Sequence, residues 1–299
     1  MRRITNPEDM RRLCRTERSA GRNVGFVPTM GALHDGHASL LRRARQECDF
    51  AVASIFVNPA QFGPTEDLSR YPRDIERDAA LLERIEIDAL FRPEAADVYP
   101  PPHRTWVTVE GMSDILCGAS RTGHFRGVAT VVLKLLNIVE PDVAYFGQKD
   151  AQQAAIIRTM AHDLNLPCRI EVCPTVREED GLAMSSRNAY LNARQRAAAP
   201  VIYRALAAAQ EDVAGGERSI AAIVARARDV LAGEPLFAIE YLELVRPDDL
   251  SPLEGEHLAG KALLAVAGRI GTTRLIDNVV LEDDGGTRAS GPQPGYSGL

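Results

Sequence analysis

The sequence has few of the features that mark secreted, membrane-spanning or polyanion-binding proteins. Its basic opening, MRRITNPEDM, is not followed by an apolar segment, so no signal peptide is expected. No apolar run approaches the roughly 18 residues that a membrane-spanning helix requires. The 35 Lys and Arg residues are outnumbered by 41 Asp and Glu residues, which gives a net charge of −6. This balance argues against a dedicated nucleic-acid binder but leaves small anionic ligands possible in a locally positive pocket.

Cysteine is scarce, and the sequence contains no CxxC pair. The five cysteines are an odd number and are scattered along 299 residues, so reduced thiols in a cytoplasmic protein are predicted. The hydrophobic share of 45% and charged share of 25% are typical of a soluble globular protein. The length suffices for one large domain or two ordinary ones, and no internal repeat is found.

Short apolar runs alternate with helical patterns through the first half of the chain. Buried strands are predicted at residues 50–57, 87–93, 142–147 and 168–176. Helices are predicted at residues 74–85, 128–139 and 151–165. The β-branched residues of 128–139 also permit a strand. The alternation implies parallel βαβ units and hence an α/β fold with an open, doubly wound sheet.

The pattern changes near residue 185. Helices are predicted at 193–213 and 219–233, with Pro200 near the start of the first or kinking it. Strands are predicted at residues 237–245, 261–270 and 273–281. We therefore expect a first domain at residues 1–185, a smaller α+β domain at 186–283 and a disordered, Gly/Pro/Ser-rich tail at 284–299.

The stretch VPTMGALHDGHASLLRRA, residues 27–44, combines two histidines with two glycines where a strand gives way to a helix. In a doubly wound sheet, ligands gather beyond the carboxyl ends of the strands. A helix beginning near His37 would direct its free N–H groups at an anion there. Imidazoles at 34 and 37 can donate hydrogen bonds to phosphate, and protonated rings add charge. This pattern favours phosphate binding over the alternative of two structural cap residues.

Two further loops follow predicted strands. In FGQKDAQQ, residues 146–153, Lys149 is a compact cation suited to phosphate, and Asp150 could cap the next helix. Gln153 is expected nearer the end of the sheet, whereas a surface position is expected for Gln152. In DGLAMSSRNAYL, residues 180–191, two hydroxyls and a guanidinium could clamp an anion, with a plain polar linker as the alternative.

These loops carry the resemblance to a known family. GALHDGH resembles the His-x-Gly-His signature of nucleotidyltransferases and class I aminoacyl-tRNA synthetases, and MSSR resembles their second, Lys-Met-Ser-Lys-Ser-like signature. From about residue 22 to 192, the chain is similar to the pantoate–β-alanine ligase family. The motifs are FVPTMGALHDGH, FVNPAQF, YPRD, GHFRGVATVVLKL, YFGQKDAQQ and PTVREEDGLAMSSRN.

The resemblance implies a Rossmann-like homodimer that joins (R)-pantoate to β-alanine through a pantoyl adenylate, releasing AMP and pyrophosphate. ATP and Mg²⁺ would be required, and the product is a coenzyme A precursor. By this similarity His37 is the proton donor, helped by His34 and Lys149. Gln61 and Gln153 would bind pantoate, with Gln61 also near β-alanine. The expected ATP-binding residues are Met30, Gly31, Ala32, Leu33, His34, Asp35, Gly36, His37, Gly147, Gln148, Lys149, Asp150, Val176, Met184, Ser185, Ser186 and Arg187.

Four positions depart from the family pattern without removing a proposed catalytic group. Gln148 stands where Glu is usual, and Ala60 where Met usually precedes a glutamine. Cys117 and Thr122 replace a common Glu and Pro.

Two residue assignments and the reaction itself stay open at this stage. Asp78 and Asp150 are considered as metal ligands, but Mg²⁺ relies largely on substrate oxygens and water, so its ligands are not assigned. Arg121 and His124 could approach the phosphates or order the loop that carries them. The alternatives to a ligase are a cytidylyltransferase-like enzyme and a non-catalytic nucleotide-sensing module. A tRNA synthetase is disfavoured by the acidic charge and the lack of a basic appendage.

Overall fold

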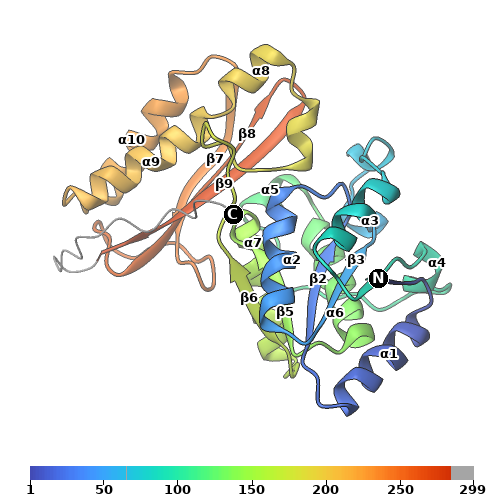
Figure 1. Ribbon diagram of the computed structural model, residues 1–299. Helices are drawn as coiled ribbons and strands as arrows, with labels where there is room; N and C mark the ends of the chain where they lie inside the picture. The colour runs from blue at the N-terminus through green and yellow to red at the C-terminus, as the bar shows by residue number, and fades with distance from the viewer. Residues whose placement is uncertain (65, 284–299) are drawn as a thin grey trace.

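The computed structural model describes residues 1–64 and 66–283, which form two units (Figure 1). Within this part of the chain, the first unit is built on a six-stranded sheet ordered β1-β4-β3-β2-β5-β6. Every neighbouring pair is parallel. The predicted α/β fold with a Rossmann-like, doubly wound sheet is confirmed. The strands are β1 (Arg2–Ile4), β2 (Val24–Thr29), β3 (Phe50–Ile55), β4 (Ala89–Phe91), β5 (Val143–Gly147) and β6 (Arg169–Cys173).

Helices cover both faces of this sheet. Because successive side chains of a strand point to opposite faces, Phe26 of β2 belongs to one hydrophobic cluster and Val27 to another. The first cluster includes residues of α1, α6 and α7, and the second includes residues of α2 and α3. The helices are α1 (Pro7–Ser19), α2 (Asp35–Glu47), α3 (Ile75–Arg84), α4 (Ala95–Val98), α5 (Cys117–Ser120), α6 (His124–Val139) and α7 (Ala151–Asp163).

The position of the site follows from the strand order. β2 and β5 are neighbours, yet the chain goes from β2 to β3 on one side and from β5 to β6 on the other. A crevice opens at such a switch point, beyond the carboxyl ends of the strands. β2 ends at Thr29, just before the GALHDGH loop, and β5 ends at Gly147, just before QKD.

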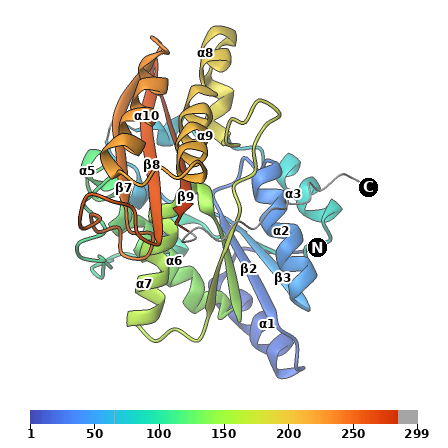
Figure 2. The ribbon, with the colours of Figure 1, turned by 90° about the vertical axis from the view of Figure 1, so that its left-hand side faces the viewer.

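The second unit is a smaller α+β domain. In the described residues, its three-stranded antiparallel sheet has the order β7 (Phe237–Val245), β8 (Lys261–Ile270) and β9 (Thr273–Glu282). Helices α9 (Val201–Ala214) and α10 (Ile220–Ala232) pack together and against this sheet (Figures 1 and 2). Pro200 separates α9 from α8 (Ala193–Ala198), so the helix predicted at 193–213 is two helices.

Two N-terminal elements were not predicted. β1 is three residues long and has two exposed arginines, so it shows no apolar run. In α1, the sequence PEDMRRLCRTERS surrounds buried Met10 and Cys14 with charged residues. The available signal was the cap, where Asn6 accepts a hydrogen bond from the amide of Glu8 ahead of the first turn.

Other expectations have mixed outcomes. Segment 128–139 lies within α6, so the alternative of a strand is wrong. The domain limits at residues 185 and 283 remain predictions, and the predicted tail at 284–299 lies outside the described residues. Among the residues that the structure describes, no helix has both the length and the apolar character to cross a bilayer.

Candidate active site

A cavity of about 220 Å³ lies at the crevice between β2 and β5, and we call it the switch-point cavity. The three loops singled out in the sequence converge on it. The predicted site residues that line it are Met30, His34, Gly36, His37, Gln61, Gly147, Lys149, Asp150, Gln153, Val176, Met184, Ser185, Ser186 and Arg187. The predicted residues that are not part of its lining are Gly31, Ala32, Leu33, Asp35 and Gln148.

The two histidines of the first loop are held by the start of α2. The helix begins at Asp35, two residues before the predicted start, with His34 as its N-cap. The Gly36 amide donates to Nδ1 of His34 at 3.1 Å, and the His34 amide donates to Nδ1 of His37 at 3.4 Å. Because each Nδ1 accepts, the proton of each neutral ring lies on Nε2. Two Nε2–H donors, on rings whose centroids are 4.1 Å apart, thus belong to the cavity.

Both imidazoles are neutral at neutral pH. Burial, reinforced by Lys149, lowers the pKa of His34 to about 4. Burial, reinforced by the neighbouring His34, lowers the pKa of His37 to about 3. The expectation that protonated imidazoles add positive charge is therefore wrong. The rings are neutral hydrogen-bond donors, and the charge at this part of the cavity comes from Lys149.

The backbone of the same loop explains its glycines. At position 36, a Cβ would lie 2.8 Å from Cε1 of His34, so a larger residue would displace that ring. Gly31 has a φ of +81°, which glycine adopts without strain. Asp78 of α3 accepts the amides of Ala32 and Leu33, each at 2.8 Å. Asp78, considered above as a metal ligand, therefore fixes this loop instead.

The second loop supplies a charged pair to the cavity. Nζ of Lys149 lies 3.5 Å from Oδ1 of Asp150. Burial tends to raise the pKa of Asp150, but Lys149 and then Arg187 outweigh it, so the net pKa is lowered and the carboxylate is ionised. In the described residues the Asp150 side chain makes no capping hydrogen bond to α7, so its suggested role as a side-chain cap is wrong. Gln153 lines the cavity from the first turn of α7.

Gln152, expected at the surface, is buried. Its Nε2 donates to the carbonyl oxygens of Met112 and Ile115 at 3.0 and 2.7 Å, and its Oε1 accepts the amide of Cys117 at 3.0 Å. These bonds tie α7 to the segment that leads into α5. The surface expectation failed because it took no account of this segment, which covers the start of α7.

The third loop presents its arginine already paired with a carboxylate. Nε and Nη2 of Arg187 donate to the two oxygens of Asp67 at 3.1 and 3.2 Å. The hydroxyl of Ser185 accepts the Arg187 amide at 3.3 Å and so caps the short turn that follows. Because this loop lines the cavity, it is more than a polar linker.

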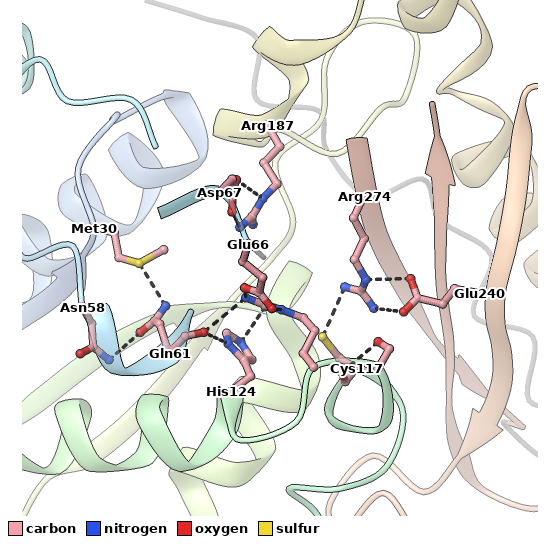
Figure 3. Close-up of polar contacts among 12 residues, drawn as sticks. Met30, Asn58, Gln61, Glu66, Asp67, Cys117, His124, Arg187, Glu240 and Arg274 are labelled. Carbon is pink, nitrogen blue, oxygen red and sulfur yellow. Dashed lines mark hydrogen bonds and ion pairs between the residues drawn. The ribbon is translucent and has the colours of Figure 1, made fainter. Parts of the chain in front are cut away.

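Gln61 is held on two sides (Figure 3). Its Nε2 donates to Sδ of Met30 at 3.0 Å, and its Oε1 accepts from Nδ2 of Asn58 at 3.0 Å. Its backbone carbonyl accepts a hydrogen bond from Nδ1 of His124 at 2.8 Å. Nε2 of His124 in turn accepts from Nη1 of Arg121 at 2.9 Å. The position of Gln61 therefore depends on a chain of contacts that reaches α6.

Arg121 and His124 hold neighbouring segments together beside the cavity. Arg121 also donates to both oxygens of Glu66, which precedes the short helix η2 (Asp67–Ser69). Burial, reinforced by Arg121, lowers the pKa of His124 to about 4, so this ring is neutral. Acidic residues 66 and 67 thus neutralise the two guanidinium groups beside the cavity.

A second, larger cavity of about 700 Å³ lies between the two units and shares Lys149, Gln153 and Arg187 with the first. We call it the interdomain cavity. Figure 3 shows Arg274 of β9 facing Glu240 of β7 and Cys117 of α5. Arg274 donates to Glu240 at 2.8 and 3.3 Å and to the Cys117 sulfur at 3.3 Å. The cysteine that departs from the family pattern therefore contacts the second domain.

Several supporting residues were missed by the sequence reasoning. Asn58 orients Gln61, and Asp67 pairs with Arg187. Asn58 is a polar residue directly after the buried strand predicted at residues 50–57, which is a detectable signal. Asp67 has no such signal, because its partner lies 120 residues away.

In the described residues, no group of three or more His, Cys, Asp or Glu side chains could hold a metal ion.

The chain is similar to proteins of one family over nearly its whole length. The family model described as Pantoate-beta-alanine ligase matches residues 2–280. A pantothenate synthetase from Heliobacterium modesticaldum is 54% identical over 282 residues, which are 94% of this chain and 100% of that protein. The crystal structure of pantothenate synthetase from Thermus thermophilus is 48% identical, with a TM-score of 0.88 over 93% of this chain and 99% of that one.

A third relative was crystallised with ligands. The pantoate-beta-alanine ligase from Francisella tularensis, complexed with beta-gamma ATP and beta-alanine, is 32% identical with a TM-score of 0.75. The alignment covers 94% of this chain and 97% of that one. Since the family model and these relatives span nearly the whole sequence, the chain belongs to the pantoate–β-alanine ligase family.

Proposed function

We propose that this chain joins (R)-pantoate to β-alanine at the switch-point cavity and converts ATP to AMP and pyrophosphate. The observation that carries the proposal is the composition of the cavity wall. Neutral imidazoles at 34 and 37, the Lys149 ammonium and the Arg187 guanidinium surround the same space as the amides of Gln61 and Gln153. These groups suit a nucleotide phosphate on one side and a small hydroxy acid on the other.

The first step activates the acid. A carboxylate does not condense with an amine in neutral water, because its oxygen is a poor leaving group. In-line attack by the pantoate carboxylate on the α-phosphorus of ATP forms the mixed anhydride pantoyl adenylate and expels pyrophosphate. Negative charge grows on the non-bridging and leaving oxygens, so donors already fixed near them lower the barrier.

We assign this task to the side chains that the cavity gathers. The Nε2–H groups of His34 and His37 would donate to phosphate oxygens, and Lys149 would add a full positive charge. Ser185 and Ser186 would donate through their hydroxyls. This assignment is supported by the hydrogen bonds that fix both imidazoles, because a fixed donor needs no reorganisation as the charge develops.

The second step transfers the acyl group to nitrogen. The neutral amine of β-alanine attacks the anhydride carbonyl, AMP leaves, and the attacking nitrogen loses a proton. No covalent enzyme intermediate is needed, so no cysteine or serine must act as a nucleophile. We propose that Gln61 and Gln153 hold pantoate through this step. The remaining task of the protein is to align the reactants and exclude water from the anhydride.

We also propose that Mg²⁺ is required. Mg²⁺ takes most of its ligands from phosphate oxygens and water, and it neutralises the phosphate charge when bound. The cavity offers the ionised carboxylate of Asp150 beside Lys149. This carboxylate suits an ion that arrives bound to the nucleotide, rather than an ion held in a fixed cage of protein ligands. Asp150 is the residue that would hold the ion.

One assay tests the proposed function. Purified protein is supplied with ATP, Mg²⁺ and pantoate, with and without β-alanine, and pyrophosphate, AMP and pantothenate are measured. We expect one equivalent of pyrophosphate per site without β-alanine, and continuous formation of AMP and pantothenate with it. Activity with CTP in place of ATP, or turnover without β-alanine, would instead favour a different nucleotidyltransferase. ATP binding without any pyrophosphate release would favour a nucleotide sensor.

Three further expectations also stand as proposals, one from the resemblance and two from the cysteine content and the net charge. We propose a homodimer, a cytoplasmic location and no nucleic-acid partner. The mass in solution, measured by light scattering after size-exclusion chromatography, tests the first. A mass of one chain at micromolar concentration would contradict it.

A further inference from the structure

Two adjacent residues of β9, in the second domain, contact two of the three loops that form the switch-point cavity. Asn278 contacts the QKD loop, and Asp277 contacts the segment that leads to MSSR. Both side chains are nearly buried, with exposed fractions of 5% and 3%. Both residues line the interdomain cavity but are not part of the lining of the switch-point cavity. Any influence on a nucleotide there would act through the loops.

Asn278 fixes the backbone on both sides of Lys149. Its Nδ2 donates to the carbonyl oxygens of Gln148 and Lys149, each at 2.9 Å. Those carbonyls belong to the two peptide units that flank the Lys149 Cα, so one side chain sets the orientation of both. The Oδ1 of Asn278 accepts from Nε2 of Gln148 at 2.9 Å. Glutamine suits position 148, because a carboxylate at that position would face the acceptor oxygen Oδ1 of Asn278.

Asp277 fixes the third loop through Arg177. The two oxygens of Asp277 accept from Nη1 and Nη2 of Arg177 at 2.6 and 3.1 Å. Nη1 of Arg177 also donates to the carbonyl of Gly181 at 3.0 Å, and the guanidinium lies 4.7 Å from the ring centroid of Tyr203. Arg177 pairs with Ala183 in a β-bridge, which closes the turn immediately before MSSR.

We propose that Asn278 and Asp277 are positioning residues that hold Lys149 and the MSSR loop at a fixed separation for binding ATP. The inference rests on the proposed function, since it needs the switch-point cavity to be the ATP site. Its physical basis is preorganisation. One strand, β9, is anchored in the second sheet and restrains both loops through two nearly buried side chains, and small displacements of binding groups are costly in rate.

The test uses the full-length protein and isosteric variants. Asn278→Asp keeps the shape of the side chain but removes both donated hydrogen bonds. Val280→Thr, on the same strand at an exposed position, is the matched control. Calorimetry gives the Kd for ATP, and pantoate-dependent pyrophosphate exchange gives the adenylation rate. We expect Asn278→Asp to weaken ATP binding and slow exchange by about tenfold or more, and Val280→Thr to leave both unchanged.

A double-mutant cycle separates positioning from general damage. If Asn278 acts through Lys149, the variant carrying both Lys149→Ala and Asn278→Asp should be no slower than Lys149→Ala alone. If the rate losses of the two single substitutions multiplied in the double variant, the inference would be overturned. Wild-type kinetics in a folded Asn278→Asp variant would also overturn it. Should that variant fail to fold, Asp277→Asn removes the charge that pairs with Arg177, and wild-type kinetics there would also overturn the inference. Unchanged ATP binding in Lys149→Ala would instead contradict the proposed site itself.

Discussion

Arg187 and Asp67, 120 residues apart in sequence, form an ion pair with two hydrogen bonds of 3.1 and 3.2 Å. Their side chains are 29% and 23% exposed, so the pair is only partly screened by water. The carboxylate holds the guanidinium in the geometry in which arginine also binds phosphate. A phosphate that binds Arg187 must therefore share or replace this partner.

Removing the carboxylate should strengthen nucleotide binding. Asp67→Asn leaves Arg187 with a neutral neighbour, and we expect the Kd for ATP to fall several-fold, by about 1 kcal/mol, the usual size for a partly exposed ion pair. Calorimetry at two salt concentrations measures the Kd for ATP. Glu76→Gln, on the exposed face of α3, is the control and should bind ATP as the parent does. A weaker ATP complex in Asp67→Asn would show that the carboxylate assists phosphate binding.

Loss of the second imidazole should slow adenylation. His37→Ala removes a fixed neutral donor from the cavity, and the typical cost of one such donor is about 3 kcal/mol, on the order of 10²-fold in rate. Exchange of labelled pyrophosphate into ATP in the presence of pantoate measures this step, and circular dichroism checks the fold. Exchange at the parental rate would remove His37 from the proposed mechanism.

Loss of the Gln153 amide should affect the binding of pantoate and of ATP differently. Gln153 lines both the switch-point and interdomain cavities, and we assign it to pantoate rather than to the nucleotide. Gln153→Ala should weaken pantoate binding by about tenfold, the loss expected for one or two hydrogen bonds, and should spare ATP. Separate titrations with each ligand measure both constants. Equal losses for both ligands would contradict the assignment.

Two glycine substitutions should have different effects. At Gly147, a Cβ would meet no protein atom within 4 Å, so Gly147→Ala should fold normally but project a methyl group into the cavity and weaken ATP binding. Gly36→Ala would press on the ring of His34 at 2.8 Å and should also lower thermal stability. Thermal unfolding and ATP titration of the two variants distinguish these outcomes. Identical melting temperatures would contradict the predicted clash at residue 36.

Acidification should destabilise the fold through buried imidazoles. The pKa of His124 is about 4 in the folded chain, against an ordinary value of 6.5, because burial and then Arg121 disfavour its charged form. The unfolded chain therefore takes up this proton first, and the free energy of unfolding falls as the pH is lowered from 6.5 towards 4. Denaturant unfolding of His124→Asn over that range should show a shallower dependence on pH than the parent. Parallel curves would show that His124 titrates normally when folded.

Much of the fold was predictable, because most strands of both sheets carry strong patterns. The predicted ranges 237–245 and 261–270 coincide with β7 and β8, and 142–147 differs from β5 by one residue. Helix α1 is amphipathic but highly charged, and its buried stripe holds only two apolar residues, Met10 and Cys14, so it was not recognised. Local patterns therefore predict elements well where one face is broadly apolar.

The site was predictable only in part. Loops at strand ends could be identified from glycines, histidines and Lys149, because these residues are unusual at such positions. The residues that contact those loops could not be identified from the sequence, since Asp78, Asp67 and Asn278 look like ordinary polar residues of a helix, a turn and a strand. Their roles depend on contacts between distant segments, which a local pattern does not encode. The protonation of the histidines likewise required knowledge of their burial.

The contacts of Asn278 with the QKD loop have a consequence for biosynthesis. During translation the histidine loop leaves the ribosome first, the lysine loop next, and β9 last of the three. A nascent chain lacking β9 has no restraint from Asn278 on the peptides around Lys149. We therefore expect the nucleotide site to reach its full affinity only after β9 has emerged and packed against the QKD loop.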